Sequence, residues 1–356
     1  MEKERNVNLD LIRCVALLMV PTMHGLDHVD IYGITLSTPG DIVMMTVKIL
    51  FTCCIPLWVL LSGSLCSRRT ISAKHYLSYM RILVVYVICS LLCIGFDKFC
   101  MHEDIGLRYT VGAIVNCYSS DYAWYIMMYT GLFLMIPFLN LMYNSLSTKK
   151  QKLGLIATFF ALSILPSLLN IYVQLYSIWW KNLYPITYYF TGAFLAEYMP
   201  RRKPSGIFAA LAAFLAAYGL FFFIHYGASG AALIDVYQNT FPVYILSVLL
   251  FIGLSNLQLE RTAAWLRKFF MRISDLSLAI YLCTWIPDRF IYPILMQRVP
   301  DIRSRYIWFP LTVLFTLTVS TLIAIPVMQV SKPLDKALRG LVMKAAAKIK
   351  AGAGAG

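Results

Sequence analysis

Charged residues are scarce in this chain. Lys, Arg, Asp and Glu make up 13% of its 356 residues, about half of the share found in a soluble domain. Acidic residues are the scarcest, since 17 Asp and Glu stand against 31 Lys and Arg, for a formal net charge of +14. Hydrophobic residues reach 60%, with a mean hydropathy of +0.69. The composition argues against a soluble domain and indicates a polytopic membrane protein, because apolar runs of about 20 residues recur along the chain.

Two motifs are also missing. No Cys-x-x-Cys pair occurs among the nine cysteines, so neither a zinc site nor a thioredoxin-like redox site is expected. Seven cysteines lie in or beside apolar segments, where the thiol behaves as a small hydrophobic group. Cys100 and Cys117 flank one loop and could pair if that loop is extracytoplasmic. Residues 1–8 lack a signal-peptide cleavage site, so we expect the first span to be retained.

The apolar runs predict an all-α fold, a membrane bundle of about ten transmembrane helices. We expect these helices at residues 9–28, 41–66, 78–98, 122–143, 153–170, 182–199, 206–226, 238–256, 274–296 and 307–330. They form one predicted membrane domain over residues 1–335. The remaining residues, 336–356, are basic and rich in Ala and Gly, and we expect a disordered tail there.

The positive charges are unevenly distributed between the connecting segments. With a cytoplasmic N-terminus, the inside segments hold 21 Lys and Arg and the outside loops hold 6. The inside set is Lys3, Arg5, Arg68, Arg69, Lys74, Lys149, Lys150, Lys152, Arg201, Arg202, Lys203, Arg261, Arg267, Lys268, Arg272, Lys332, Lys336, Arg339, Lys344, Lys348 and Lys350, and the outside set is Lys98, Arg108, Lys181, Arg298, Arg303 and Arg305. This bias predicts that both termini are cytoplasmic. We therefore assign the net charge to topology and anionic lipid, and not to nucleic acid. The last outside loop, with three Arg, departs from the rule, and a binding role or a snorkelling belt are both open.

The first predicted span carries two ionisable residues, Arg13 and His24. At about 100° per residue, their separation in sequence places them on one helix face, about 16 Å apart along the axis. Ionisable side chains inside a span are costly and mark candidate functional sites. The alternative is a snorkelling Arg near the helix end and a hydrogen-bonded His inside the bundle.

Asp27 and His28 follow His24 by one helical turn. A contact with Asp27 would hold the imidazole in one tautomer and raise its basicity. His24 and His28 are also a possible metal pair, but no third ligand has a suitable spacing, and we expect no metal. The candidate catalytic residues are therefore His24 and Asp27.

Three more arginines lie at the predicted cytoplasmic ends of the second and third spans. They are Arg68, Arg69 and Arg81, and together with Arg13 they offer four guanidinium groups, which suit bidentate phosphate binding. The positive-inside rule alone suffices for Arg68 and Arg69. It accounts less well for Arg13 and Arg81, which lie within the apolar pattern.

Small and aromatic residues mark two further places. Ser62 and Gly63, in the second predicted span, would let another helix or a ligand approach the backbone closely. Trp124 and Tyr125 open the fourth predicted span, where aromatic residues are expected as an interfacial belt.

Four stretches of the chain resemble the acyltransferase-3 family of integral membrane acyltransferases. They are Leu9-Asp10-Leu11-Ile12-Arg13 through His24, which matches the family's Arg-x10-His motif; Pro56-Leu57-Trp58 through Ser62-Gly63; Arg81-Ile82; and Trp124-Tyr125 with Gly131 and Pro137. The chain also departs from the family pattern. Leu77 and Ser78 stand where a further Arg is often found, and Thr284 stands where a His often follows a late Tyr-Leu motif.

This resemblance implies a multi-pass enzyme of the bacterial cytoplasmic membrane. It would move an acyl group, expected to be acetyl, from acetyl-CoA or another acyl-CoA to a hydroxyl of a cell-surface or lipid-linked glycan. In this interpretation His24 and Asp27 are catalytic, Arg13, Arg81, Arg68, Arg69, Ser62 and Gly63 bind the donor, and Trp124 and Tyr125 contact the acceptor. A flippase of a lipid-linked sugar, or an acyltransferase for a small molecule, is the alternative, since intramembrane Arg and His also mark transport pathways.

The distribution of cations makes a testable prediction about topology. In a cysteine-substituted background, a cysteine at position 103 or 304 should react with a membrane-impermeant reagent applied from outside intact cells, because both positions fall in predicted outside loops. Cysteines at positions 150 and 348 serve as inside controls. Reaction at position 103 only after permeabilisation would overturn the map.

Overall fold

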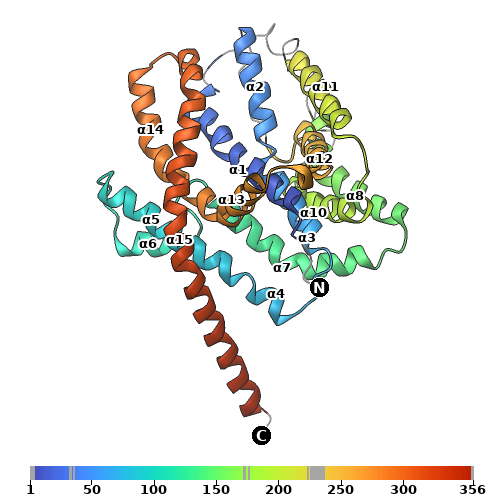
Figure 1. Cartoon of the computed structure of the whole chain (residues 1–356), viewed down its shortest axis with the longest axis vertical. Helices are drawn as coiled ribbons and strands as arrows, with labels where there is room; N and C mark the ends of the chain where they lie inside the picture. The colour runs from blue at the N-terminus through green and yellow to red at the C-terminus, as the bar shows by residue number, and fades with distance from the viewer. Residues whose placement is uncertain are drawn as a thin grey trace. The chain divides into compact units, whose positions relative to one another are not determined.

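The computed structural model describes residues 5–31, 34, 37–170, 174, 177–222, 224 and 237–353. No β-strand occurs among these residues, and the predicted all-α class is confirmed. Figure 1 labels the α-helices of the described residues except the four-residue α9. In chain order, the helices are α1 (Val7–His28), α2 (Pro39–Phe51), α3 (Cys54–Cys66), α4 (Ala73–Leu77), α5 (Met80–Phe99), α6 (Leu107–Val115), α7 (Trp124–Asn144), α8 (Lys149–Ser163), α9 (Pro166–Leu169), α10 (Tyr184–Tyr198), α11 (Pro204–Phe222), α12 (Phe241–Ser255), α13 (Ala264–Cys283), α14 (Trp285–Arg298) and α15 (Ile302–Ala353).

The chain divides into two compact units. Unit 1 comprises Met1–Arg68, Leu139–Ser277 and Phe290–Phe315, and unit 2 comprises Arg69–Phe138, Leu278–Arg289 and Thr316–Gly356. The single domain predicted for residues 1–335 stays a prediction. Helix α15 continues through Ala353, where the sequence analysis expected disorder from residue 336. Ala, Lys and Leu are frequent in this segment and are strong helix formers. The expectation of disorder was based on the biased composition and did not take this helix propensity into account.

Within the described residues, six helical segments are long and apolar enough to cross a membrane. They are Val7–His28, Pro39–Cys66, Ala73–Phe99, Trp124–Asn144, Pro204–Phe221 and Ile302–Ala346; a seventh is added if α13 and α14 form one bent span. Helices α8, α10 and α12 have 15 residues each, so each extends only about 22 Å, less than the roughly 30 Å of a hydrocarbon core. The multi-pass membrane class is thereby supported, and the count of ten spans stays a prediction.

Two of the predicted helices are broken, and each break lies just before a proline. The helix expected at 41–66 separates into α2 and α3 at Thr52 and Cys53, four and three residues before Pro56. The helix expected at 274–296 starts earlier and bends by 54° between α13 and α14, just after Cys283, which lies four residues before Pro287. Proline has no N–H to bond the carbonyl four residues back, and its ring clashes with that carbonyl.

In unit 1, α3 and α10 approach each other at two glycines. A Cβ on Gly63 would collide with the backbone of Tyr189 and Ala193, and a Cβ on Gly192 would collide with the backbone of Leu60. The space beside Gly63 is therefore filled by a helix, which is one of the two alternatives that the sequence left open.

The arginines after α14 bond to the protein itself, within unit 1. Arg303 forms a bidentate pair with buried Asp41 on α2, at 3.0 and 3.1 Å. Arg305 donates to the carbonyls of Val29, Val299 and Pro300 at 3.1, 2.8 and 2.7 Å. The two cations thus satisfy acceptors within unit 1, of which Asp41 and the carbonyl of Val29 belong to buried residues.

Unit 2 has its own buried polar groups. Asp288 on α14 is 1% exposed and accepts hydrogen bonds from the hydroxyls of Tyr122 at 2.7 Å and Thr316 at 2.6 Å. Helix α6 packs beside α5, and the hydroxyl of Tyr86 on α5 donates to the carbonyl of Ile114 at 2.8 Å. Cys100 and Cys117 are both free thiols, so the disulfide considered above does not form between them in this structure.

The glycine contacts predict a local stability defect. Gly63→Ala should lower the free energy of unfolding by about 1–3 kcal/mol, because two backbones must separate to admit the methyl group. Gly154→Ala on α8 is the control; its Cβ would meet nothing within 4 Å and should leave stability equal or higher. Thermal unfolding of both variants in one detergent makes the comparison, and a Gly63→Ala protein as stable as wild type would contradict the packing role.

Candidate functional site

A charged cavity of about 860 Å³ lies in unit 1. Its charged lining residues are Arg5, Asp10, Arg13, Arg68, Lys152 and Glu197. Four cations thus face two carboxylates, and the lining also includes Ser64 on α3, Ser67 just after it and Asn144 on α7. The excess of positive charge makes the cavity suitable for an anionic ligand.

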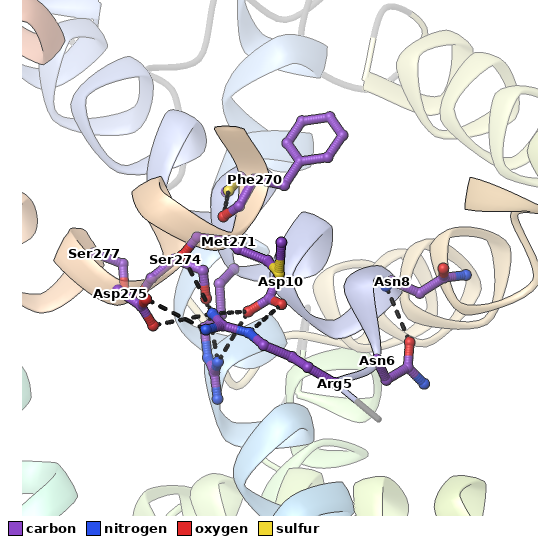
Figure 2. A network of polar contacts seen from close by, with 11 residues as sticks. Arg5, Asn6, Asn8, Asp10, Phe270, Met271, Ser274, Asp275 and Ser277 are labelled. Atoms are coloured by element: carbon purple, nitrogen blue, oxygen red, sulfur yellow. Dashed lines mark hydrogen bonds and ion pairs between the residues drawn. The ribbon is translucent and has the colours of Figure 1, made fainter. Parts of the chain in front are cut away.

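Arg5 joins the start of α1 to α13 at the edge of this cavity (Figure 2). Its guanidinium makes two 2.7 Å bonds to Asp10, which is 2% exposed, and two longer bonds, of 3.0 and 3.3 Å, to the exposed Asp275. The bonds to Asp10 and then to Asp275 raise the pKa of the Arg5 guanidinium above its ordinary value. Asn6 caps the helix by accepting from the N–H of Asn8, so the first turn of α1 is held in place.

Arg13 lies one turn after Asp10 and shares that carboxylate. Its Nη1 is 3.5 Å from Asp10 Oδ1 and donates to Ser274 Oγ at 3.2 Å. The side chain is 33% exposed and lines the cavity. None of the described residues accepts a hydrogen bond from its Nε or Nη2, so part of the fork remains available to an anion.

The two other cations of the cavity differ in their pairing. Lys152 on α8 bonds to Glu197 at 2.7 and 2.9 Å and lies 4.6 Å from the centre of the Tyr143 ring. Arg68, just after α3, is exposed and makes no ion pair with any described residue. Arg13 and Arg68 are therefore the cavity cations whose guanidinium groups have N–H donors available to bind a phosphate.

His24 lies near the other end of α1, which runs from Val7 to His28 with Pro21 inside it. Because the helix is continuous, the expected rise of about 16 Å between Arg13 and His24 is retained. The His24 side chain is 15% exposed, and its Nδ1 is 4.0 Å from Oδ2 of Asp27. The predicted His24–Asp27 proximity is therefore present.

Asp27 also pairs with Lys48, a cation that was not among the predicted site residues. The ammonium of Lys48 on α2 forms an ion pair with Oδ1 of Asp27. Lys48 is 3% exposed, whereas the Asp27 side chain is 41% exposed. The signal was present in the sequence, because a lysine inside the apolar run 41–66 is the same kind of exception as Arg13.

His28 has a packing role beside this group. Its ring stacks on Tyr292, with centroids 4.7 Å apart, and Gly25 makes room for that tyrosine. Across the described residues no group of three or more His, Cys, Asp or Glu side chains is arranged to hold a metal ion.

The other predicted site residues fall elsewhere. Ser62 donates to the carbonyl of Trp58 at 2.9 Å, and neither Ser62 nor Gly63 is among the residues lining the cavity.

Arg69, Arg81, Trp124 and Tyr125 belong to unit 2. Arg69 donates to Ser78 at 3.3 Å, Arg81 is exposed, and Tyr125 is buried against the rings of Tyr129 and Tyr281. Within unit 1, the structure thus brings Arg13 and Arg68 to one cavity and His24 to Asp27.

The family comparison agrees with this set of features. Residues 6–328 match the family model described as an acyltransferase domain, which defines the class as a membrane acyltransferase. The chain belongs to the acyltransferase-3 family, and the resemblance drawn from its motifs is confirmed. Neither the curated proteins nor the solved structures contain a match to the chain.

Proposed function

We propose that this acyltransferase moves an acetyl group from acetyl-CoA to a hydroxyl of a cell-surface or lipid-linked glycan, as a protein of the bacterial cytoplasmic membrane. One observation carries the proposal: α1 bears Arg13 at a cationic cavity and His24 about 16 Å further along the same helix. A phosphate-binding end and a base-bearing end on one rigid element match a donor that has phosphates at one end and a thioester at the other.

The cationic cavity supports an acyl-CoA donor. Its volume of about 860 Å³ lies within the usual range for a ligand site. Arg13 and Arg68 offer guanidinium groups to the phosphates, and the ion pair with Asp10 restrains the orientation of Arg13. From the resemblance alone, donor-binding roles are also proposed for Arg81, Arg69, Ser62 and Gly63, and acceptor-binding roles for Trp124 and Tyr125.

His24 supplies the base in the proposed transfer. The acceptor hydroxyl oxygen attacks the thioester carbonyl carbon and gives its proton to His24. The C–O bond forms, the C–S bond breaks, and the proton passes from His24 to the departing thiolate, so that CoA leaves as a thiol. Asp27, next to Nδ1, favours the tautomer whose other nitrogen accepts that proton. A route in which His24 first carries the acyl group uses the same residue.

The donor site predicts a selective effect of Arg13→Lys. The variant keeps the charge but loses the bidentate fork, so CoA should bind about tenfold more weakly while the fold is preserved. Thermal stabilisation of detergent-purified protein by CoA is the measurement. Arg261→Lys, outside the cavity, should behave as wild type. A Lys variant that binds CoA like wild type would make Arg13 a snorkelling anchor, and a wild-type protein that CoA does not stabilise would favour the flippase alternative.

The catalytic role predicts a graded series on α1. His24→Ala should abolish transfer of acetyl from acetyl-CoA while the protein still inserts, folds and binds CoA. Asp27→Asn should reduce transfer less, because it removes only the orienting carboxylate. His28→Ala, one turn from His24 and stacked on Tyr292, is the matched control and should retain transfer. Transfer at the wild-type rate in His24→Ala would exclude this mechanism.

A further inference from the structure

Lys48 is an ammonium group buried inside a membrane-crossing segment. It is 3% exposed on α2, whose neighbouring positions are apolar, and its ion pair reaches across to Asp27 on α1. We propose that Lys48 is a positioning residue for the catalytic base, which acts on His24 through Asp27. This inference rests on the proposed function and adds to it a residue from a second helix.

The two oxygens of Asp27 have different partners. Oδ1 pairs with Lys48, and Oδ2 lies 4.0 Å from Nδ1 of His24. Lys48 thus fixes the carboxylate at one oxygen and leaves the other directed at the imidazole. Its own backbone is held in α2, where its carbonyl accepts a bond from the Thr52 hydroxyl at 2.8 Å. The arrangement restrains the carboxylate from a helix other than the one that carries His24.

The charge of Lys48 matters as much as its position. The ammonium lies against Oδ1 and leaves Oδ2 as the acceptor that faces Nδ1 of His24, so the carboxylate can stabilise the imidazolium that forms during transfer.

Simple snorkelling does not describe this lysine. A snorkelling ammonium reaches for the aqueous interface and stays accessible. The ammonium of Lys48 is the buried partner of its pair, and the carboxylate it holds is 41% exposed. The accessible part of the pair is thus the carboxylate next to His24, which is the arrangement expected if the lysine serves the base.

Steady-state kinetics on the full-length protein in detergent test the proposal. With acetyl-CoA as donor and a glycan acceptor, Lys48→Met should lower kcat about 10- to 100-fold and leave KM for acetyl-CoA within twofold, because the donor cavity is lined by other residues. Lys48→Arg should restore most of kcat. In the Asp27→Asn background, Lys48→Met should lower kcat no further, since both changes remove the same restraint.

A second ion pair on α2 provides the matched control. Asp41 is fully buried and pairs with Arg303, whose side chain is 42% exposed, so Asp41→Asn also changes the buried member of an ion pair on α2. It should lower the melting temperature, as Lys48→Met should, without lowering kcat per folded molecule.

Three results would overturn the proposal. They are a kcat of Lys48→Met equal to wild type per folded protein, an equal loss of kcat in Asp41→Asn, and losses that multiply in the Lys48→Met/Asp27→Asn double variant. A wild-type protein that transfers nothing from acetyl-CoA would instead overturn the proposed function and this inference with it.

Discussion

A charge inside an apolar membrane segment needs a partner, and this constraint organises unit 1. Asp10, 2% exposed, is paired with Arg5 and lies near Arg13. Lys48, 3% exposed, is paired with Asp27, and the fully buried Asp41 is paired with Arg303. The cost of burying each group is offset only by a partner on another part of the chain. The pairs of Lys48 and Asp41 each join two helices, α2 to α1 and α2 to α15, and so fix which of them are neighbours.

Helix α1 is held at both ends by such pairs. Near its N-terminus, Asp10 connects through Arg5 to Asp275 on α13. Near its C-terminus, Asp27 connects to Lys48 on α2, and Arg305 on α15 donates to the carbonyl of Val29. A helix restrained in this way keeps a constant spacing between the side chains on it. The separation between the cavity and the imidazole is then a property of α1 alone.

Hydropathy and motif spacing were enough to predict the helical class, the membrane character and the family. They also placed Arg13 and His24 on α1 and Asp27 beside His24, because these relations are local to one helix. The breaks at Thr52 and after Cys283 were not predicted, although Pro56 and Pro287 are visible in the sequence. A hydropathy pattern shows where apolar residues recur, but it does not show that a proline removes a backbone hydrogen bond of the helix.

Contacts between helices were the part that the sequence could not provide. Lys48 was visible as a charge in an apolar run, but its partner lies 21 positions away on another helix. Gly63 packs against α10, a helix that begins more than a hundred residues further along the chain. Such pairings depend on the tertiary arrangement, and the periodicity within a single segment carries no information about them.

The glycine contact between α3 and α10 also limits which substitutions can be accepted at Gly63 and Gly192. At Gly63 and at Gly192 the atoms that a methyl group would meet belong to the backbone of the opposite helix. A smaller side chain on that helix cannot relieve the collision, because every residue has the same backbone. No substitution on the facing helix can therefore compensate for a larger residue at either position. The requirement for glycine applies to each position separately, and the two positions should not show the covariation that is typical of residues in contact.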